Sequence, residues 1–174
     1  MLCAPHLPQE PNPIFNTAPS TKILIVGQAP GLKAHERETA FEDPSGDRLR
    51  DWLSGSRETF CNPRLVSVMP MGFCFPGYKN GADAPPRKEC APTWHNEFLF
   101  YLKPKITLYV GRYSQQYYLP QFKTLTEAVR TPSESHFVLP HPSGRNNRWL
   151  AKNPWFELEI LPALKRTIAS VLSA

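Results

Sequence analysis

Two short segments of the chain contain side chains that could act on a bound molecule. The first is Gly27-Gln28-Ala29-Pro30-Gly31, in which two glycines and a proline favour a tight turn with backbone amides free to face an anion or a carbonyl. Gln28 adds one hydrogen-bond donor and one acceptor to that turn. By itself, the segment is equally typical of a plain turn between a strand and a helix.

The second segment is His141-Pro142-Ser143. A histidine at this place could donate a hydrogen bond into a cleft, while the proline and the serine hold the turn that orients it. Taken alone, one histidine is more often a structural residue. Two unusual turns together favour a functional site, provided that the fold brings them to one place.

Each segment follows a run of apolar residues that predicts a buried strand. Four such runs occur, at 23–26, 65–69, 106–110 and 136–139. Helical patterns separate them, at about 45–54, 87–103, 113–119 and 153–172. This alternation predicts an α/β fold: a three-layer α/β/α sandwich with a central, mostly parallel four-stranded sheet.

The same pattern predicts where a site should lie and how the chain is organised. Ligands of such sheets bind outside the carboxyl ends of the strands, where both segments fall. Residues 1–20 are rich in proline and are expected to form an N-terminal arm, followed by a single domain over 21–174. Ser45 is the expected cap of the first helix, and Leu158 is expected on the buried face of the last helix, which Pro162 should kink.

The site segments also resemble a known family. Gln28 with its loop, Phe41 followed by Asp43-Pro44-Ser45-Gly46, and His141-Pro142-Ser143 stand in the order and spacing of the uracil-DNA glycosylase superfamily. The sequence is most similar to the bacterial and archaeal branches related to families 4 and 5, from about Lys22 to the final helix. The resemblance implies a base-excision repair enzyme that flips a deaminated base, first of all uracil, out of DNA and hydrolyses its N-glycosidic bond without a cofactor.

The resemblance also assigns roles to residues. Gln28 would position the attacking water, Asp43 would assist electrostatically, and His141 would stabilise the negative charge on the departing base. Base contacts are implied for four residues: Gly27, Ala29, Phe41, which would stack on the base, and Met71. The resemblance implies DNA contacts for Ser143, Arg145 as the wedge that enters the duplex, and Asn146. Arg148 and Lys152 are expected to contact DNA because they are basic residues that follow the last strand.

Two departures from the family pattern affect mechanism and substrate. Family 4 enzymes have a carboxylate at the position of Gln28, and an amide cannot serve as a general base near neutral pH. Asp43 is then the nearest candidate, although Asp-Pro-Ser-Gly is also good sequence for the start of a helix. Family 4 has an asparagine that reads uracil where this chain has Met-Pro-Met-Gly-Phe at 69–73. Backbone groups would then have to read the base, and hypoxanthine is an alternative substrate.

The cysteines resemble part of a metal site. Cys74 and Cys90 have the spacing of one half of the four-iron cluster of families 4 and 5, and Cys3 matches one further ligand. Three thiolates fall short of the usual four, with Cys61 and His6 as substitutes. The alternative is four free thiols in a reducing cytosol.

Charge and composition bound the remaining choices. Lys and Arg total 20 against 15 Asp and Glu, a net charge of +5 that suits DNA as a partner. No apolar run of about 18 residues occurs, and the N-terminus lacks the basic and apolar regions of a signal peptide, so a cytoplasmic monomer without a membrane partner is expected. Two rival functions stay open: a non-catalytic binder of damaged or single-stranded DNA, and a nucleotide or small-metabolite hydrolase, although no phosphate-binding fingerprint is present.

Overall fold

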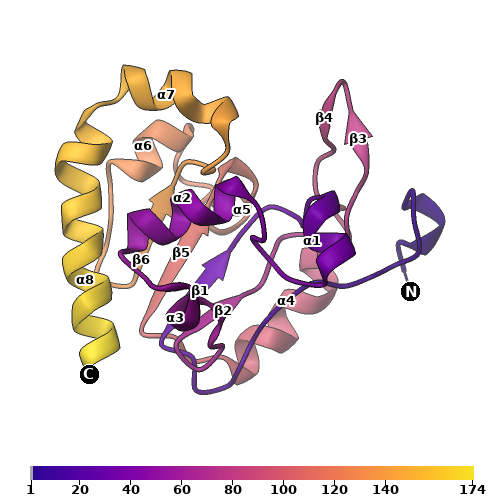
Figure 1. The fold of residues 1–174 in the computed structure, drawn as a ribbon, viewed down its shortest axis with the longest axis horizontal. Coiled ribbons are helices and arrows are strands. Elements are labelled where there is room, and N and C mark those ends of the chain that lie inside the picture. Colours follow the sequence, from indigo (N-terminus) through magenta and orange to yellow (C-terminus); the bar gives the residue numbers. More distant parts are fainter. Residues whose placement is uncertain (1) are drawn as a thin grey trace.

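The computed structural model describes residues 2–174. At its centre lies a sheet of four strands in the order β2-β1-β5-β6, and every pairing is parallel (Figure 1). The strands are β1 (Ile23–Val26), β2 (Val66–Val68), β5 (Ile106–Val110) and β6 (His136–Leu139). They fall on the four apolar runs, so the predicted α/β fold with a central parallel sheet is confirmed.

Helices cover both faces of this sheet because its central strands are apolar on both sides. Ile23 and Ile25 pack into one core cluster, whereas Leu24 and Val26 pack into the other, as the two-residue period of a strand requires. Helices on the first face are α2 (Pro44–Leu53), α3 (Arg57–Cys61), α6 (Leu125–Val129) and α8 (Leu161–Ser173). Helices on the second face are α4 (Cys90–Tyr101) and α5 (Arg112–Tyr118).

Two local predictions were wrong. Asp43, not Ser45, caps α2: its Oδ1 accepts the Gly46 N–H at 2.9 Å. Leu158 is 74% exposed, because the final helix opens with a π-helical turn, η3 (Phe156–Ile160), that shifts the phase of its buried face. Pro162 lies just beyond this turn, where its missing N–H and bulky ring disfavour regular α-helical bonding.

A small β-hairpin stands apart from the main sheet, in the long loop after β2 (Figure 1). Its strands β3 (Tyr78–Lys79) and β4 (Ala82–Asp83) are antiparallel and joined by Asn80 and Gly81, which both have positive φ, of 53° and 72°. Positive φ at both central residues defines a type I′ turn, and Asn-Gly is its preferred sequence. The sequence analysis did not predict this hairpin.

The remaining elements are four short helices: η1 (Ala4–His6), α1 (Leu32–Arg37), η2 (Gly144–Asn146) and α7 (Asn147–Lys152).

The segment before β1 packs against the central sheet. Ile14 is buried, and Asn16 forms an antiparallel bridge with Val68 at the edge of β2. The domain boundary at residue 20 stays a prediction. Among residues 2–174, no helix has the length and apolar character needed to cross a membrane.

Candidate active site

A cleft of about 620 Å³ opens at the carboxyl ends of β1, β5 and β6. The strand order reverses between β1 and β5, because β2 lies on one side of β1 and the later strands lie on the other. Ligands of open parallel sheets usually bind at such a point. The cleft is lined by the first loop (27–31), by Gly111 and Arg112 after β5, by His141 after β6, and by the β3–β4 hairpin. The predicted location of the site is therefore where the structure has its cleft.

The first loop is fixed by backbone hydrogen bonds to the chain that leaves β2. The Met71 N–H donates to the Gly27 carbonyl and the Gly72 N–H to the Gln28 carbonyl, both at 3.0 Å. These bonds secure the main chain while the Gln28 side chain makes no hydrogen bond within residues 2–174 and lines the cleft. Gln28 thus has a fixed backbone and an amide available to a ligand.

Gly111 lets Gln28 and His141 approach each other. Its φ is +89°, and a Cβ built on it would lie 3.6 Å from the His141 Cβ and 3.9 Å from the Gln28 Oε1. The two predicted chemical groups, about 113 residues apart in the chain, therefore meet above this glycine.

His141 is arranged to act as a neutral hydrogen-bond donor. The Ser143 N–H donates to its Nδ1 at 3.3 Å, so Nδ1 holds a lone pair and Nε2 holds the ring proton. Burial lowers the pKa of His141, and the negative charge of Asp43 opposes this shift. The Asn146 amide donates to the His141 carbonyl at 2.8 Å and steadies the turn.

Phe41 lies over the first loop in a strained backbone conformation. Its φ is 56°, and its Cζ would lie 3.3 Å from a Cβ on Gly27. Gly46 makes room for this conformation, because a Cβ there would lie 1.8 Å from the Phe41 carbonyl oxygen. An edge-to-face contact with Phe60, with the ring centroids 6.0 Å apart, supports the ring from behind.

Asp43 has a structural task and also lines the cleft. One carboxylate oxygen is engaged by the Gly46 N–H at the start of α2. Its charge acts on His141 across the site. The two interpretations of Asp43, as a residue that starts a helix and as a site residue, are thus compatible in this geometry.

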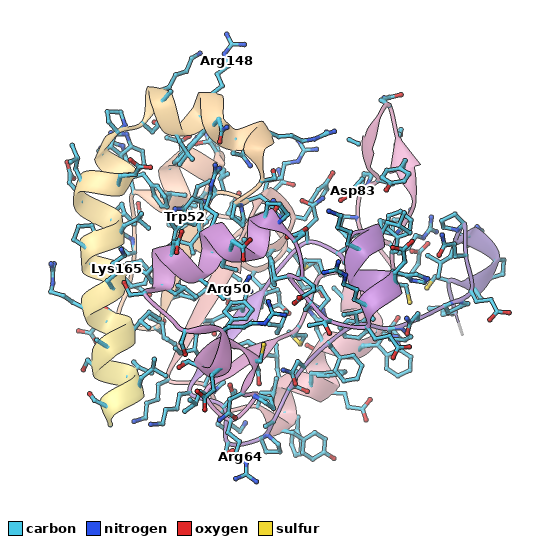
Figure 2. The ribbon with its side chains drawn as sticks, in the orientation of Figure 1. Arg50, Trp52, Arg64, Asp83, Arg148 and Lys165 are labelled. Carbon is cyan, nitrogen blue, oxygen red and sulfur yellow. The ribbon has the colours of Figure 1, made fainter. Side chains whose placement is uncertain are left out.

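The residues expected to contact DNA divide into two groups. Ser143, Arg145 and Asn146 line the cleft, and Arg145 donates to the Gly81 carbonyl at 2.9 Å, which links η2 to the β3–β4 hairpin. Arg148 and Lys152 are exposed on α7 and do not line the cleft; Arg148 points away from the body in Figure 2. Any contact of this second group with DNA would involve flanking phosphates.

Among the residues expected to contact the base, Gly27, Ala29 and Phe41 line the cleft. Met71 does not: its side chain is 6% exposed and packs with Leu24 and Val26 in the core. The structure therefore does not bring the Met71 side chain to a base, and only its backbone supports the first loop.

The cysteines do not form the expected iron-sulfur half-site. No group of three or more His, Cys, Asp or Glu residues within 2–174 is placed to hold a metal ion, and all four cysteines are free thiols. Burial raises the pKa of Cys74 to about 11 and also raises that of Cys90, and the nearby Cys3 contributes to both shifts. The placement of Cys3, Cys74 and Cys90 therefore does not support the iron-sulfur prediction.

Sequence reasoning missed the contribution of the hairpin to the site. Four hairpin residues line the cleft: Tyr78, Gly81, Ala82 and Asp83. Asp83 adds a second carboxylate to the one contributed by Asp43. The signal that could have found it is Asn80-Gly81, which predicts a tight hairpin that returns the chain toward the sheet.

The fold and the site define a class of α/β proteins with a polar cleft at the carboxyl ends of a parallel sheet. The cleft is lined by the Gln28 amide, the His141 imidazole and the Phe41 ring. The family model of the Uracil DNA glycosylase superfamily matches residues 14–165. The chain therefore belongs to the uracil DNA glycosylase superfamily.

One solved structure is similar over most of both chains. It is the solution structure of a Methanosarcina acetivorans protein described as a "putative Uracil DNA glycosylase". The two chains are 16% identical, and the match covers 88% of this chain and 94% of that one with a TM-score of 0.56. At this identity the likeness supports the fold.

Proposed function

We propose that this chain is a DNA glycosylase that hydrolyses the N-glycosidic bond of a deaminated base flipped out of DNA, with uracil as the first candidate. The observation that supports it best is the meeting of Gln28 and His141 above Gly111, beside the Phe41 ring, in one cleft of the superfamily fold. Location in the cytoplasm, a monomeric state and DNA as the partner belong to the same proposal.

The proposed reaction breaks the bond between the sugar C1′ and the base nitrogen. The bonding electrons leave with the base, and the sugar acquires oxocarbenium character. The His141 Nε2–H would donate to a carbonyl oxygen of the departing base, where negative charge develops, and the neutral ring already has its proton on that nitrogen. Phe41 would stack on the base and hold it in line.

Water would complete the reaction. The Gln28 amide can orient a water molecule toward C1′ but cannot remove its proton. Asp43 would stabilise the positive sugar and accept the proton as the new C1′–O bond forms. No cofactor takes part, because an oxocarbenium ion is electrophilic enough to react with weakly activated water.

The experiment uses duplex oligonucleotides with one uracil, hypoxanthine or xanthine, followed by alkaline cleavage at abasic sites. We expect slow but measurable release from uracil, lowered by Asp43→Asn, and raised or broadened by Gln28→Glu if the loop geometry is shared with family 4. Asp51→Asn, an exposed change on α2 outside the cleft, serves as the matched control.

Gln28 also supports a second candidate, a non-catalytic binder of damaged DNA, since an amide at the place of a carboxylate is what a loss of catalysis would leave. Binding of all three substrates without base release would establish that alternative. An unchanged rate in Asp43→Asn would reduce Asp43 to a helix cap and leave Gln28 as the sole residue acting on water.

A further inference from the structure

The loop after β2 has no side chain at 69–73 that could read the edge of a base. Met69, Met71 and Phe73 are at most 7% exposed and pack into the core on the α4 side of the sheet. A glycosylase of this fold must still distinguish a deaminated base from the parent bases that outnumber it. The backbone N–H groups of this segment are also engaged, with Met71 and Gly72 donating to the first loop, so the reader of the base edge is to be sought in another part of the cleft.

The same loop continues into the β3–β4 hairpin, which returns Asp83 to the cleft. The Asp83 Oδ2 lies 3.5 Å from where a Cβ would stand on Gly31, at the end of the first loop. Gly31 has no side chain, so the carboxylate occupies the space beside this loop. A two-residue type I′ turn fixes the register of the hairpin, and with it the position of Asp83.

The Asp83 carboxylate is not engaged by other side chains. Within the described residues 2–174, it accepts no side-chain hydrogen bond and forms no ion pair, unlike the carboxylates of Glu42, Asp47 and Glu89. Burial raises its pKa, Arg145 lowers it and Asp43 raises it. An exposed acceptor without a side-chain partner, at the wall of a cleft, is open to a ligand N–H.

Deamination changes one group on the base in the way that a carboxylate can detect. Cytosine N3 and adenine N1 are lone-pair acceptors, whereas uracil N3 and hypoxanthine N1 bear a hydrogen beside a carbonyl. A carboxylate forms a charge-assisted hydrogen bond with such an N–H and repels a lone pair at the same position. One acidic side chain would thus favour uracil over cytosine and hypoxanthine over adenine, the two parent bases that lack this N–H.

We propose that Asp83 is a specificity-determining residue, which accepts a hydrogen bond from the lactam N–H of the extruded base and so selects uracil and hypoxanthine over their parent bases, cytosine and adenine. The inference rests on the proposed glycosylase function and deepens it. It also gives the β3–β4 hairpin a function, since the hairpin places this acceptor in the same cleft as Asp43 and His141.

The test combines a protein change with a substrate change. Release of the base is measured under single-turnover conditions from DNA containing deoxyuridine or 3-methyl-deoxyuridine, which lacks the N–H. In Asp83→Ala we expect release from deoxyuridine to fall by about 10- to 100-fold, the effect of removing one charge-assisted hydrogen bond. The preference of the wild-type protein for deoxyuridine over its methylated form should shrink by a similar factor.

Controls separate this role from a structural one. Asp83→Glu should retain more of the preference than Asp83→Ala, and Asp51→Ala should leave it unchanged. Equal preference ratios in wild type and Asp83→Ala would overturn the role of Asp83 while the glycosylase function stands. No release of uracil by the wild-type protein would instead refute the proposed function, and the two failures are therefore distinguishable.

Discussion

Replacement of His141 by alanine tests the leaving-group donor. The change removes the Nε2–H that the Ser143 N–H, by engaging Nδ1, holds in the donor form. Loss of one preorganised donor to a developing anion lowers the rate by about 100- to 1000-fold, or about 2.7–4 kcal/mol of barrier. DNA binding should change little, because the donor acts mainly on charge that develops in the transition state.

The assay is single-turnover base release, with substrate affinity measured separately. His136→Ala is the matched control, since His136 stands at the amino end of β6 and His141 just after its carboxyl end. The control should keep the wild-type rate. A His141→Ala rate within a few-fold of wild type would refute the assignment of the donor.

The pH dependence gives a second reading of the same residue. Burial lowers the pKa of His141, so the ring is neutral at its ordinary titration point near 6.5. The rate should therefore persist at pH 6.5 and fall only as the pH drops through the lowered pKa, where a proton on Nδ1 would oppose the Ser143 N–H. This limb should vanish in His141→Ala; a limb that survives would belong to another group.

Three further predictions concern stability and DNA binding. Gly46→Ala should reduce the free energy of unfolding by about 1–3 kcal/mol or more in urea titrations, because its Cβ would collide with the Phe41 carbonyl; wild-type stability would refute this. Arg148→Ala and Lys152→Ala should weaken DNA binding equally for all sequences. The slope of log affinity against log salt concentration should decrease in magnitude by about one for each DNA phosphate that is no longer neutralised. An unaltered slope in both variants would show that α7 does not contact the DNA backbone. His95 is buried in α4, and burial lowers its pKa. Below pH 6.5 the unfolded chain therefore binds more protons than the folded chain, so the urea concentration at half-unfolding should decrease as the pH is lowered. His95→Asn should flatten this pH dependence.

The four strands were predictable from the sequence because each is a continuous apolar run, a pattern that reflects burial on both faces of a parallel sheet. The place of Gln28 and His141 followed from the strands, since parallel strands end at one edge. Phe41 and Asp43 followed from the family resemblance. Their strained and capping geometries depend on Gly46, whose close contact with the Phe41 carbonyl is a tertiary feature.

The errors have identifiable physical causes. Leu158 was misplaced because a π-helical turn breaks the regular helical period from which its burial was inferred. Cys74 and Cys90 have metal-like spacing, but they are buried free thiols, and no group of three or more potential ligands within residues 2–174 is placed to hold a metal ion, so the iron-sulfur prediction is not supported. Asp83 was missed because hydrophobic periodicity says nothing about a hairpin of four strand residues outside the sheet, although its turn sequence was readable.

The central claim is that this cleft hydrolyses the glycosidic bond of a deaminated base. The most direct measurement is mass spectrometry of free bases released by the wild-type protein from one duplex that contains uracil, hypoxanthine and xanthine among ordinary bases. If the cleft has this activity, we expect free uracil in excess of the enzyme, one abasic site for each base released, and no free cytosine or adenine. DNA binding without any free base, or release of undamaged and deaminated bases alike, would contradict it.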